Sequence, residues 1–276
     1  MKKILAALLT VVLMTSAAIG LTSCGGNDGT NMYDGLVILE TDVFEVEQYG
    51  IAFRKGMTTA KEVDSILADL FADGTIAEIA EKYDVKPAAK FEKGNNSSAT
   101  DASDLAAIKA KGKLVIGITE YAPMNYKDAN GKWVGFDTEV AEAVCAKLGV
   151  TAEFKEIVWD NKLLDLESGN IDCIWNGMTI TDAIKNAAEV SGAYMENGQV
   201  IVIKKGAFAS AEELVGKQIA VEGGSAGQTQ ATLNFPNSTI KEVEAQTDAL
   251  LEVKSGASDA CVIDIVMAKA LLNSAK

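Results

Sequence analysis

Short apolar runs alternate with amphipathic stretches along most of the chain. Runs such as LVIGI at 114–118 are continuous, which is typical of strands buried on both faces of a sheet. The intervening stretches carry apolar residues at helical spacing and several end at a glycine, as at Gly149. We predict strands at 36–40, 48–55, 114–118, 153–157, 171–175, 200–204, 218–222 and 260–263, and helices at 59–74, 76–83, 137–148, 161–168, 182–189, 226–233, 247–255 and 266–274.

Strands that alternate with helices indicate an α/β fold with mostly parallel sheets. Two local signals fix helix starts in this pattern. Thr59 and Glu62 have the spacing of a capping box, and Asp137 is expected to be the N-cap of its helix.

The N-terminus has the features of an exported lipoprotein. Lys2 and Lys3 precede an apolar run, and small residues lead to the sequence LTSCG, so residues 1–23 are interpreted as a signal peptide with a lipobox-type cleavage site. Cys24 is then the lipidated first residue of the mature chain, and residues 24–32 are a flexible tether. An uncleaved membrane helix is the alternative, since the run approaches the length of a span.

Composition excludes several classes of protein. The chain has no histidine, so His-based triads and His metal sites are excluded, and we expect neither a metal nor a cofactor. A formal net charge of -14 argues against nucleic acid as a partner. With Cys24 lipidated, three cysteines remain, Cys145, Cys173 and Cys261, and we expect no disulfide among them.

Residues 113–182 resemble the first lobe of the extracellular solute-binding proteins of polar amino-acid ABC transporters, the family 3 type. The resemblance implies a two-lobed, periplasmic-binding-protein-like fold of type II, with a hinge and a cleft between the lobes. Residues 33–85 look like the carboxyl-terminal end of such a protein, yet here they come first. The sequence GNNSSATDAS is of the kind usually found just after a lipidated cysteine, yet it lies in mid-chain.

A circular permutation is the simplest explanation of this order. The chain would be opened between the last helix and the strand LVILE, with the original ends joined through a linker of coil-like composition. The domain boundaries expected on this interpretation are 33–45 in lobe 2 and the hinge, 46–85 in lobe 1, 86–104 as linker, 105–197 in lobe 1 and 198–276 in lobe 2.

Candidate ligand-binding residues in lobe 1 follow the ends of strands, where ligands gather in parallel sheets. The resemblance implies that Tyr121 and Trp159 pack on the ligand, although ordinary core packing is the alternative for both. It also implies that the segment after the strand IDCIW binds the ligand's ammonium and carboxylate. That segment comprises Trp175, Asn176, Gly177, Met178 and Thr179, and its first two residues are bulkier than the family's usual ones.

Lobe 2 contributes a helix start and an acid. Ser225 and Ala226 open a helix whose free N–H groups favour an anion, and the resemblance assigns Asp264 to the ligand's α-ammonium. The family's carboxylate-binding arginine maps to Ile184. Lys185 is adjacent but about 100° away around the helix, so the sequence shows no cation for the carboxylate and favours amines or modified amino acids over acidic ones.

The resulting hypothesis is a monomeric, lipid-anchored substrate-binding component of an amino-acid ABC importer, at the outer face of the cell membrane. Its partners would be a small zwitterion or amine and the permease subunits. Two alternatives remain open. One is an enzyme similar to cyclohexadienyl dehydratases, with Glu120, Glu196 or Glu222 as general acid, and the other is an extracytoplasmic sensor module.

Overall fold

Two α/β lobes share one long strand, β9 (Met195–Lys204). This computed structural model describes residues 31–40, 44–88 and 90–272, so the predicted signal peptide, Cys24 and all but the last two residues of the tether lie outside the described residues. Within the described chain the main path of strands runs β11-β10-β12-β9-β2-β7-β3-β6, with β1 added beside β9 and β8 beside β2. Strands β10, β11 and β12 at one end of this path, and β3, β6 and β7 at the other, pair in parallel, whereas β9 and β2 between them pair antiparallel with their neighbours. The result is the mixed, mostly parallel α/β architecture that the sequence predicted.

Lobe 1 is built on β3 (Lys113–Ile118), which pairs in parallel with β6 (Thr151–Glu156) and β7 (Cys173–Thr179). The antiparallel strand β2 (Val46–Arg54) lies on the other side of β7. Its remaining elements are α1 (Thr59–Ala72), α2 (Thr75–Lys82), α3 (Ser103–Lys111), β4 (Tyr126–Lys127), β5 (Trp133–Val134), α4 (Phe136–Leu148), η1 (Trp159–Asn161), α5 (Lys162–Glu167), α6 (Asp182–Ala187) and β8 (Ala188–Val190).

Lobe 2 is smaller and uses the same construction. Strand β10 (Gln218–Glu222) pairs in parallel with β11 (Thr239–Val243) and β12 (Ala260–Asp264). Its remaining elements are β1 (Leu36–Leu39), η2 (Ala211–Leu214), α7 (Ala226–Asn234), α8 (Gln246–Ser255) and α9 (Ile265–Leu272). Because β10 and β12 are fully or almost fully buried, their continuous apolar runs are what this position in the sheet requires.

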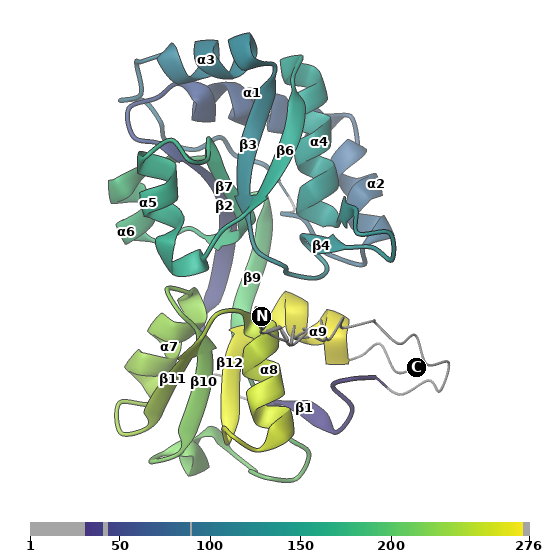
Figure 1. Ribbon diagram of the computed structural model, residues 1–276, viewed down its shortest axis with the longest axis vertical. Coiled ribbons are helices and arrows are strands. Elements are labelled where there is room, and N and C mark those ends of the chain that lie inside the picture. The colour runs from purple at the N-terminus through teal and green to yellow at the C-terminus, as the bar shows by residue number, and fades with distance from the viewer. Residues whose placement is uncertain (1–30, 41–43, 89, 273–276) are drawn as a thin grey trace, which may run out of the picture. The chain divides into compact units, whose positions relative to one another are not determined.

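Strand β9 connects the two lobes, and Figure 1 shows it passing from one into the other. Its first residues pair with β2, as Met195 does with Tyr49, while its later residues pair with β12 and β1, as Val202 does with Cys261. The same ten-residue strand is therefore part of both sheets.

The early segment carrying β2, α1 and α2 packs in the core of lobe 1. Tyr49, Phe53 and Leu67 are fully buried in one cluster with Leu114 and Val144. Such burial of large apolar side chains stabilises the fold by about 1.5 to 3 kcal/mol for each residue.

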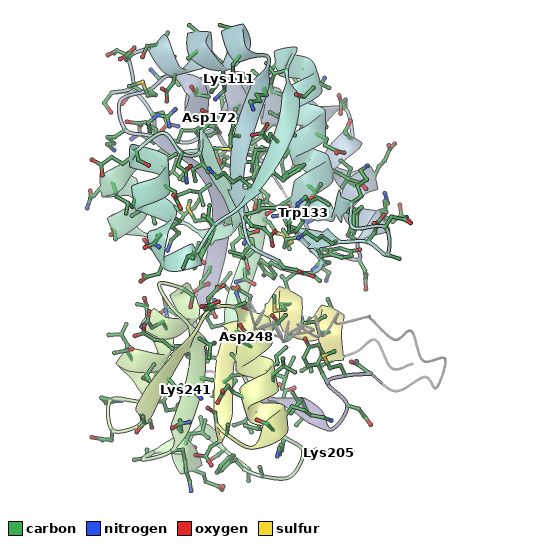
Figure 2. The ribbon with its side chains drawn as sticks, viewed as in Figure 1. Lys111, Trp133, Asp172, Lys205, Lys241 and Asp248 are labelled. Atoms are coloured by element: carbon green, nitrogen blue, oxygen red, sulfur yellow. The ribbon has the colours of Figure 1, made fainter. Side chains whose placement is uncertain are left out.

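A polar network joins the same segment to later strands. Arg54 donates to Asp104 at 2.8 Å and to the carbonyl of Ile171 at 2.8 Å, and it lies 3.5 Å from Asp172. Asp172 also accepts from the backbone of Val115 at 2.7 Å and pairs with Lys111, whose position beside Asp172 can be followed in Figure 2.

In the connecting segment 86–104, the described residues before Ser103 form neither a helix nor a strand, as the composition predicts, but they make specific contacts with lobe 1. Asp64 on α1 accepts from the backbone of Gly94 and of Gly192, each at 2.8 Å. Asn96 is buried and donates to the carbonyl of Val190 at 2.9 Å. The segment is thus attached to lobe 1 both by its backbone, through Gly94, and by a side chain, that of Asn96.

The capping box predicted at Thr59 and Glu62 is not formed in the structure. Thr59 is already inside α1, the N-cap is Thr58 without a side-chain hydrogen bond, and the hydroxyl of Thr59 is buried without a partner among the described residues. Helix α3, strands β4, β5, β8 and β11, and the turn η2 are additional elements. The helix predicted at 182–189 ends at Ala187, because the chain continues from there as β8, which pairs with β2.

No helix among the described residues is long and apolar enough to cross a membrane. Cys145, Cys173 and Cys261 are buried free thiols, in agreement with their apolar surroundings in the sequence. Burial raises the pKa of all three thiols, so they behave as small apolar side chains.

Candidate functional site

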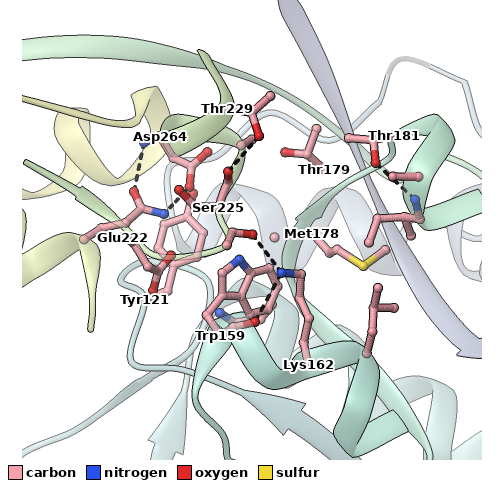
Figure 3. A pocket seen from close by; sticks show the side chains of 18 residues that line it. Tyr121, Trp159, Lys162, Met178, Thr179, Thr181, Glu222, Ser225, Thr229 and Asp264 are labelled. Carbon is pink, nitrogen blue, oxygen red and sulfur yellow. Dashed lines mark hydrogen bonds between the residues drawn. The ribbon is translucent and has the colours of Figure 1, made fainter. Parts of the chain in front are cut away.

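Residues from both lobes enclose a cavity of about 200 Å³, drawn in Figure 3. Its walls come from the carboxyl-terminal ends of strands such as β7, β10 and β12 and from the first turns of neighbouring helices such as α5 and α7, the region where ligands bind in parallel sheets. The lining residues are Tyr121, Trp159, Lys162, Leu163, Asn176, Gly177, Met178, Thr179, Thr181, Ala183, Ile184, Glu222, Gly224, Ser225, Ala226, Thr229, Gln246 and Asp264.

The structure brings ten of the eleven predicted ligand-binding residues to this cavity. Trp175 is the exception. Its side chain is 1 % exposed and packs in the core of lobe 1 beside Tyr194, because alternate residues of a strand face opposite sides of the sheet. We therefore withdraw Trp175 from the predicted set on the basis of its position.

Tyr121 and Trp159 form the aromatic part of the wall. The hydroxyl of Tyr121 lies 2.7 Å from that of Tyr49, and its backbone exchanges hydrogen bonds with Asn125 just after β3. Trp159 is 7 % exposed and begins the short helix η1. Both side chains are buried, and the Tyr121 hydroxyl has a side-chain partner, so the structure defines where each ring lies.

Gly177 lets the end of β7 approach these rings closely. Its φ is +57°, and a Cβ atom at this position would lie 2.6 Å from the ring of Tyr121. Only glycine adopts this backbone conformation in so little space.

Asp137 holds this bend in β7 from behind. It is not the N-cap of α4, as predicted, because the N-cap is Gly135 and Asp137 lies in the first turn. Its buried carboxylate accepts from the backbone N–H of Gly177 at 2.8 Å and from the hydroxyl of Tyr194 at 3.0 Å. Burial raises the pKa of Asp137 to about 7, and these two hydrogen bonds oppose the rise.

Asp264 stands at the end of β12 within a group of amide side chains. One of its oxygens accepts from Gln199 at 2.8 Å and from Asn197, and the other accepts from Gln246. Burial raises the pKa of Asp264, while the amide hydrogen bonds lower it.

Glu47, a residue that the sequence did not single out, lies beside this group. Its carboxylate accepts from Gln199 at 2.9 Å and from Thr179 at 3.1 Å. It comes from β2, so the amide of Gln199 on β9 connects acids from β2 and β12.

Glu222 lies at the end of β10 and is 5 % exposed. Burial raises the pKa of Glu222 to about 8, with a further contribution from the charge of Asp264, while Lys162 opposes the rise. Glu120 and Glu196, the other acids considered for an enzyme, are exposed and do not line the cavity.

Ser225 caps α7 by accepting from the backbone N–H of Gln228 at 3.0 Å. The first-turn N–H groups of a helix have no partner within the helix. The wall formed by Ser225 and Ala226 is therefore positively polarised, which is the property on which the predicted anion site depends.

Ile184 is 7 % exposed and packs in a cluster with Trp159 and Met178. Lys185 does not line the cavity, and its ammonium lies 3.5 Å from Asp182 on the exposed side of α6. Position 184 therefore presents an apolar surface, and its neighbour supplies no charge to the cavity.

Lys162 is the cation that the sequence interpretation missed. It is 8 % exposed and donates to the carbonyl of Gly224 at 2.8 Å and to that of Trp159 at 3.2 Å. Its ammonium also lies 4.7 Å from the centre of the Trp159 ring. Lys162 follows Trp159 by three residues, which places both side chains on one helical face. Because Trp159 was a predicted ligand-binding residue, this spacing could have indicated that Lys162 also faces the cavity.

Among the described residues, no group of three or more His, Cys, Asp or Glu side chains could hold a metal ion. The cavity instead combines buried carboxyl groups, one ammonium, a helix N-terminus and aromatic rings. Such a combination can hold a small polar molecule by hydrogen bonds and charge, and it defines a two-lobed ligand-binding protein.

The comparisons with known proteins agree with this class. The family of bacterial extracellular solute-binding proteins, family 3, matches residues 114–259, and the chain belongs to that family. It is 32% identical over 188 residues to the ABC transporter glutamine-binding protein GlnH of Bacillus subtilis (strain 168), covering 64% of this chain and 68% of GlnH.

Two further relatives show the same relationship. The L-cystine-binding protein TcyJ of Escherichia coli (strain K12) is 29% identical over 171 residues, which is 60% of this chain and 64% of TcyJ. The crystal structure of the ancestral amino acid-binding protein AncCDT-1, a precursor of cyclohexadienyl dehydratase, matches with a TM-score of 0.56 and 36% identity, covering 58% of this chain and 73% of that one. The chain thus spans about two thirds of the curated relatives it matches.

Proposed function

We propose that this protein is the substrate-binding component of an amino-acid ABC importer and that it binds a small amino acid or a related amine between its lobes. The observation that carries the proposal is the cavity with Asp264 buried in its wall, in a chain whose relatives are amino-acid-binding proteins of ABC transporters. A buried carboxylate is a favourable partner for an ammonium, because a charge-assisted hydrogen bond is strong where water is excluded.

Closure of the lobes would complete the site. Tyr121 and Trp159 belong to lobe 1, and Asp264 belongs to lobe 2, so a ligand bound to all three holds the lobes together. The faces of the two rings also attract a cationic group. In the proposed complex the ammonium lies at Asp264, the side chain packs against the rings, and the carboxylate faces the N-terminus of α7.

A thermal-shift screen with single amino acids and amines tests this function. A ligand at about 100 times its Kd stabilises the folded state by about 2.7 kcal/mol, which raises Tm measurably. Glutamine, cystine, histidine, arginine and their decarboxylated amines form the first set. If none raises the Tm of the wild-type protein, the proposed function is wrong.

We further propose that Cys24 is lipidated and holds the protein, as a monomer, at the outer face of the membrane, next to the permease subunits. The sequence LTSCG before a polar tether supports this location. Partition of the expressed protein into detergent, compared with a Cys24→Ser variant, is the test. Equal partition of both proteins would contradict the anchor.

An enzyme on this scaffold is the second candidate, because AncCDT-1 is described as a precursor of a dehydratase and Glu222 has a raised pKa inside the cavity. A carboxyl group that holds its proton near neutral pH can act as a general acid. Incubation of each bound ligand with the protein, followed by analysis for products, separates the candidates. Turnover that is lost in Glu222→Gln would establish the enzyme.

A further inference from the structure

Lys162 carries a positive charge that the protein leaves without a carboxylate partner. No ion pair among the described residues includes it, and its ammonium donates only to the carbonyls of Trp159 and Gly224. Burial lowers the pKa of Lys162, and the charges of Glu222 and Asp160 only partly oppose this. A buried charge without a counter-charge is unfavourable in a folded protein, so a residue of this kind calls for a partner.

The position of Lys162 indicates the charge of that partner. Its ammonium binds the carbonyl of Gly224, the residue before the Ser225 cap of α7. Lys162 and the N-terminus of α7 therefore meet at one part of the cavity wall, where both favour an anion. Figure 3 shows Lys162 beside Trp159 with its ammonium directed into this part of the cavity.

The rest of the wall offers no other cation. Of the residues that line the cavity, Lys162 is the one lysine, and none is arginine. Ile184 presents only an alkyl side chain. A carboxylate in the cavity would therefore find a full positive charge at Lys162 and nowhere else in its described lining.

We propose that Lys162 binds the carboxylate of the ligand and makes the site select amino acids over the corresponding amines. This inference rests on the proposed function, since it assigns the anionic group of the same ligand. The hydrogen bond from Lys162 in lobe 1 to Gly224 in lobe 2 also places the ammonium at the part of the wall where the two lobes meet.

The test compares pairs of probes that differ by the carboxylate alone: glutamine with 4-aminobutanamide, histidine with histamine, and arginine with agmatine. Affinities are measured by calorimetry for wild type, Lys162→Met and Lys162→Arg. The methionine keeps an apolar stem of similar length without the charge, and the arginine keeps the charge. Lys185→Met, which removes an exposed ammonium from α6, is the matched control.

For the probe that binds, wild type should prefer the acid over the amine by about 10- to 100-fold, as expected for a hydrogen bond between charged groups. Lys162→Met should reduce this ratio to about 3-fold or less and leave the amine's affinity nearly unchanged, whereas Lys162→Arg and Lys185→Met should retain the preference. Thermal unfolding confirms that each variant is folded, and if Lys162→Met is not, Lys162→Gln replaces it.

Two results would overturn the proposal. One is a preference for the acid that survives in Lys162→Met, and the other is an equal loss of acid and amine binding, which would mean that Lys162 only joins the lobes. Failure of the proposed function is a different result, because wild type would then bind none of the six probes.

Discussion

The carboxylate of Asp264 is surrounded by neutral donors, since three amide side chains donate to it and the hydroxyl of Tyr49 also lowers its pKa. None of these donors neutralises the negative charge as the ammonium of a ligand would. The amides fix the orientation of the carboxylate before the ligand arrives, which reduces the entropy lost on binding.

Replacing Asp264 with asparagine should weaken ligand binding about 30-fold, or about 2 kcal/mol, because an amide cannot neutralise the ligand's ammonium. Calorimetry with the amino acid identified by thermal shift measures the loss. Asp182→Asn, which changes a side chain that is 95% exposed, is the control. Unchanged affinity in a folded Asp264→Asn protein would contradict the assignment.

The raised pKa of Glu222 predicts a pH-dependent stability. The native group, with a pKa of about 8, holds its proton more tightly than the unfolded group near 4.5. Its favourable contribution is therefore complete below about pH 4.5 and is lost as the pH rises through 8. Glu222→Gln cannot ionise, so the variant should gain stability relative to wild type between pH 5 and pH 8.5, by a few kcal/mol.

Urea denaturation at both pH values gives this difference directly. Asp264, Lys162 and Asp248, whose charges act on Glu222, are present in both proteins, so their own titration largely cancels. A stability difference that stays constant from pH 5 to pH 8.5 would show that Glu222 ionises normally.

At the level of elements, the sequence predicted the long buried strands, because a strand buried on both faces is a continuous apolar run, but it missed the short or partly exposed strands β4, β5, β8 and β11. Helix α3 was not predicted because only Ile108 of its nine residues is buried, so the sequence shows almost no helical period of apolar residues.

Contacts between distant residues were also missed. Asp137 had the sequence position of an N-cap, but its carboxylate binds Gly177, 40 residues away. Lys162 was missed for the same reason, since its partner Gly224 is 62 residues away. Pattern reading recovers local preferences and cannot recover such distant contacts.

Asp64 is one of several groups that hold segment 86–104 against lobe 1. Asp64 binds the backbone N–H groups of Gly94 and Gly192 with separate oxygens. Asp64→Asn replaces one of these acceptors with an NH₂ group, which cannot accept, so the variant should lose about 1 to 3 kcal/mol of unfolding free energy. It should also be cleaved faster within 86–104 in limited proteolysis.

Asp69→Asn on the same helix, where the side chain is exposed, is the matched control for Asp64→Asn. If both variants have the same stability and the same cleavage pattern, the segment is held by its other contacts rather than by Asp64.

At the level of the whole molecule, the order of segments stays the least tested prediction. The side chain of Asn31 donates to the carbonyl of Leu271 at 2.6 Å, so the beginning of the described chain lies beside its last helix. A rearranged chain that runs from 90 to 276, through a short glycine-serine linker, into 31–88 keeps the segment bound by Asp64 and should therefore fold, because chain order matters little when the joined ends are close.

This rearranged protein should bind the same ligand with a Kd within about threefold of wild type, since every lining residue of the cavity is retained. Calorimetry and thermal unfolding provide the comparison. A rearranged chain that is folded but does not bind, or that fails to fold, would contradict the predicted circular permutation.

Strand β9 affects how one lobe can rotate relative to the other. Because it pairs with β2 at one end and with β12 and β1 at the other, the lobes cannot rotate about a slack joint. A rotation of one lobe relative to the other therefore has to twist or bend this strand, and the hydrogen bonds along both of its ends limit how far it can do so.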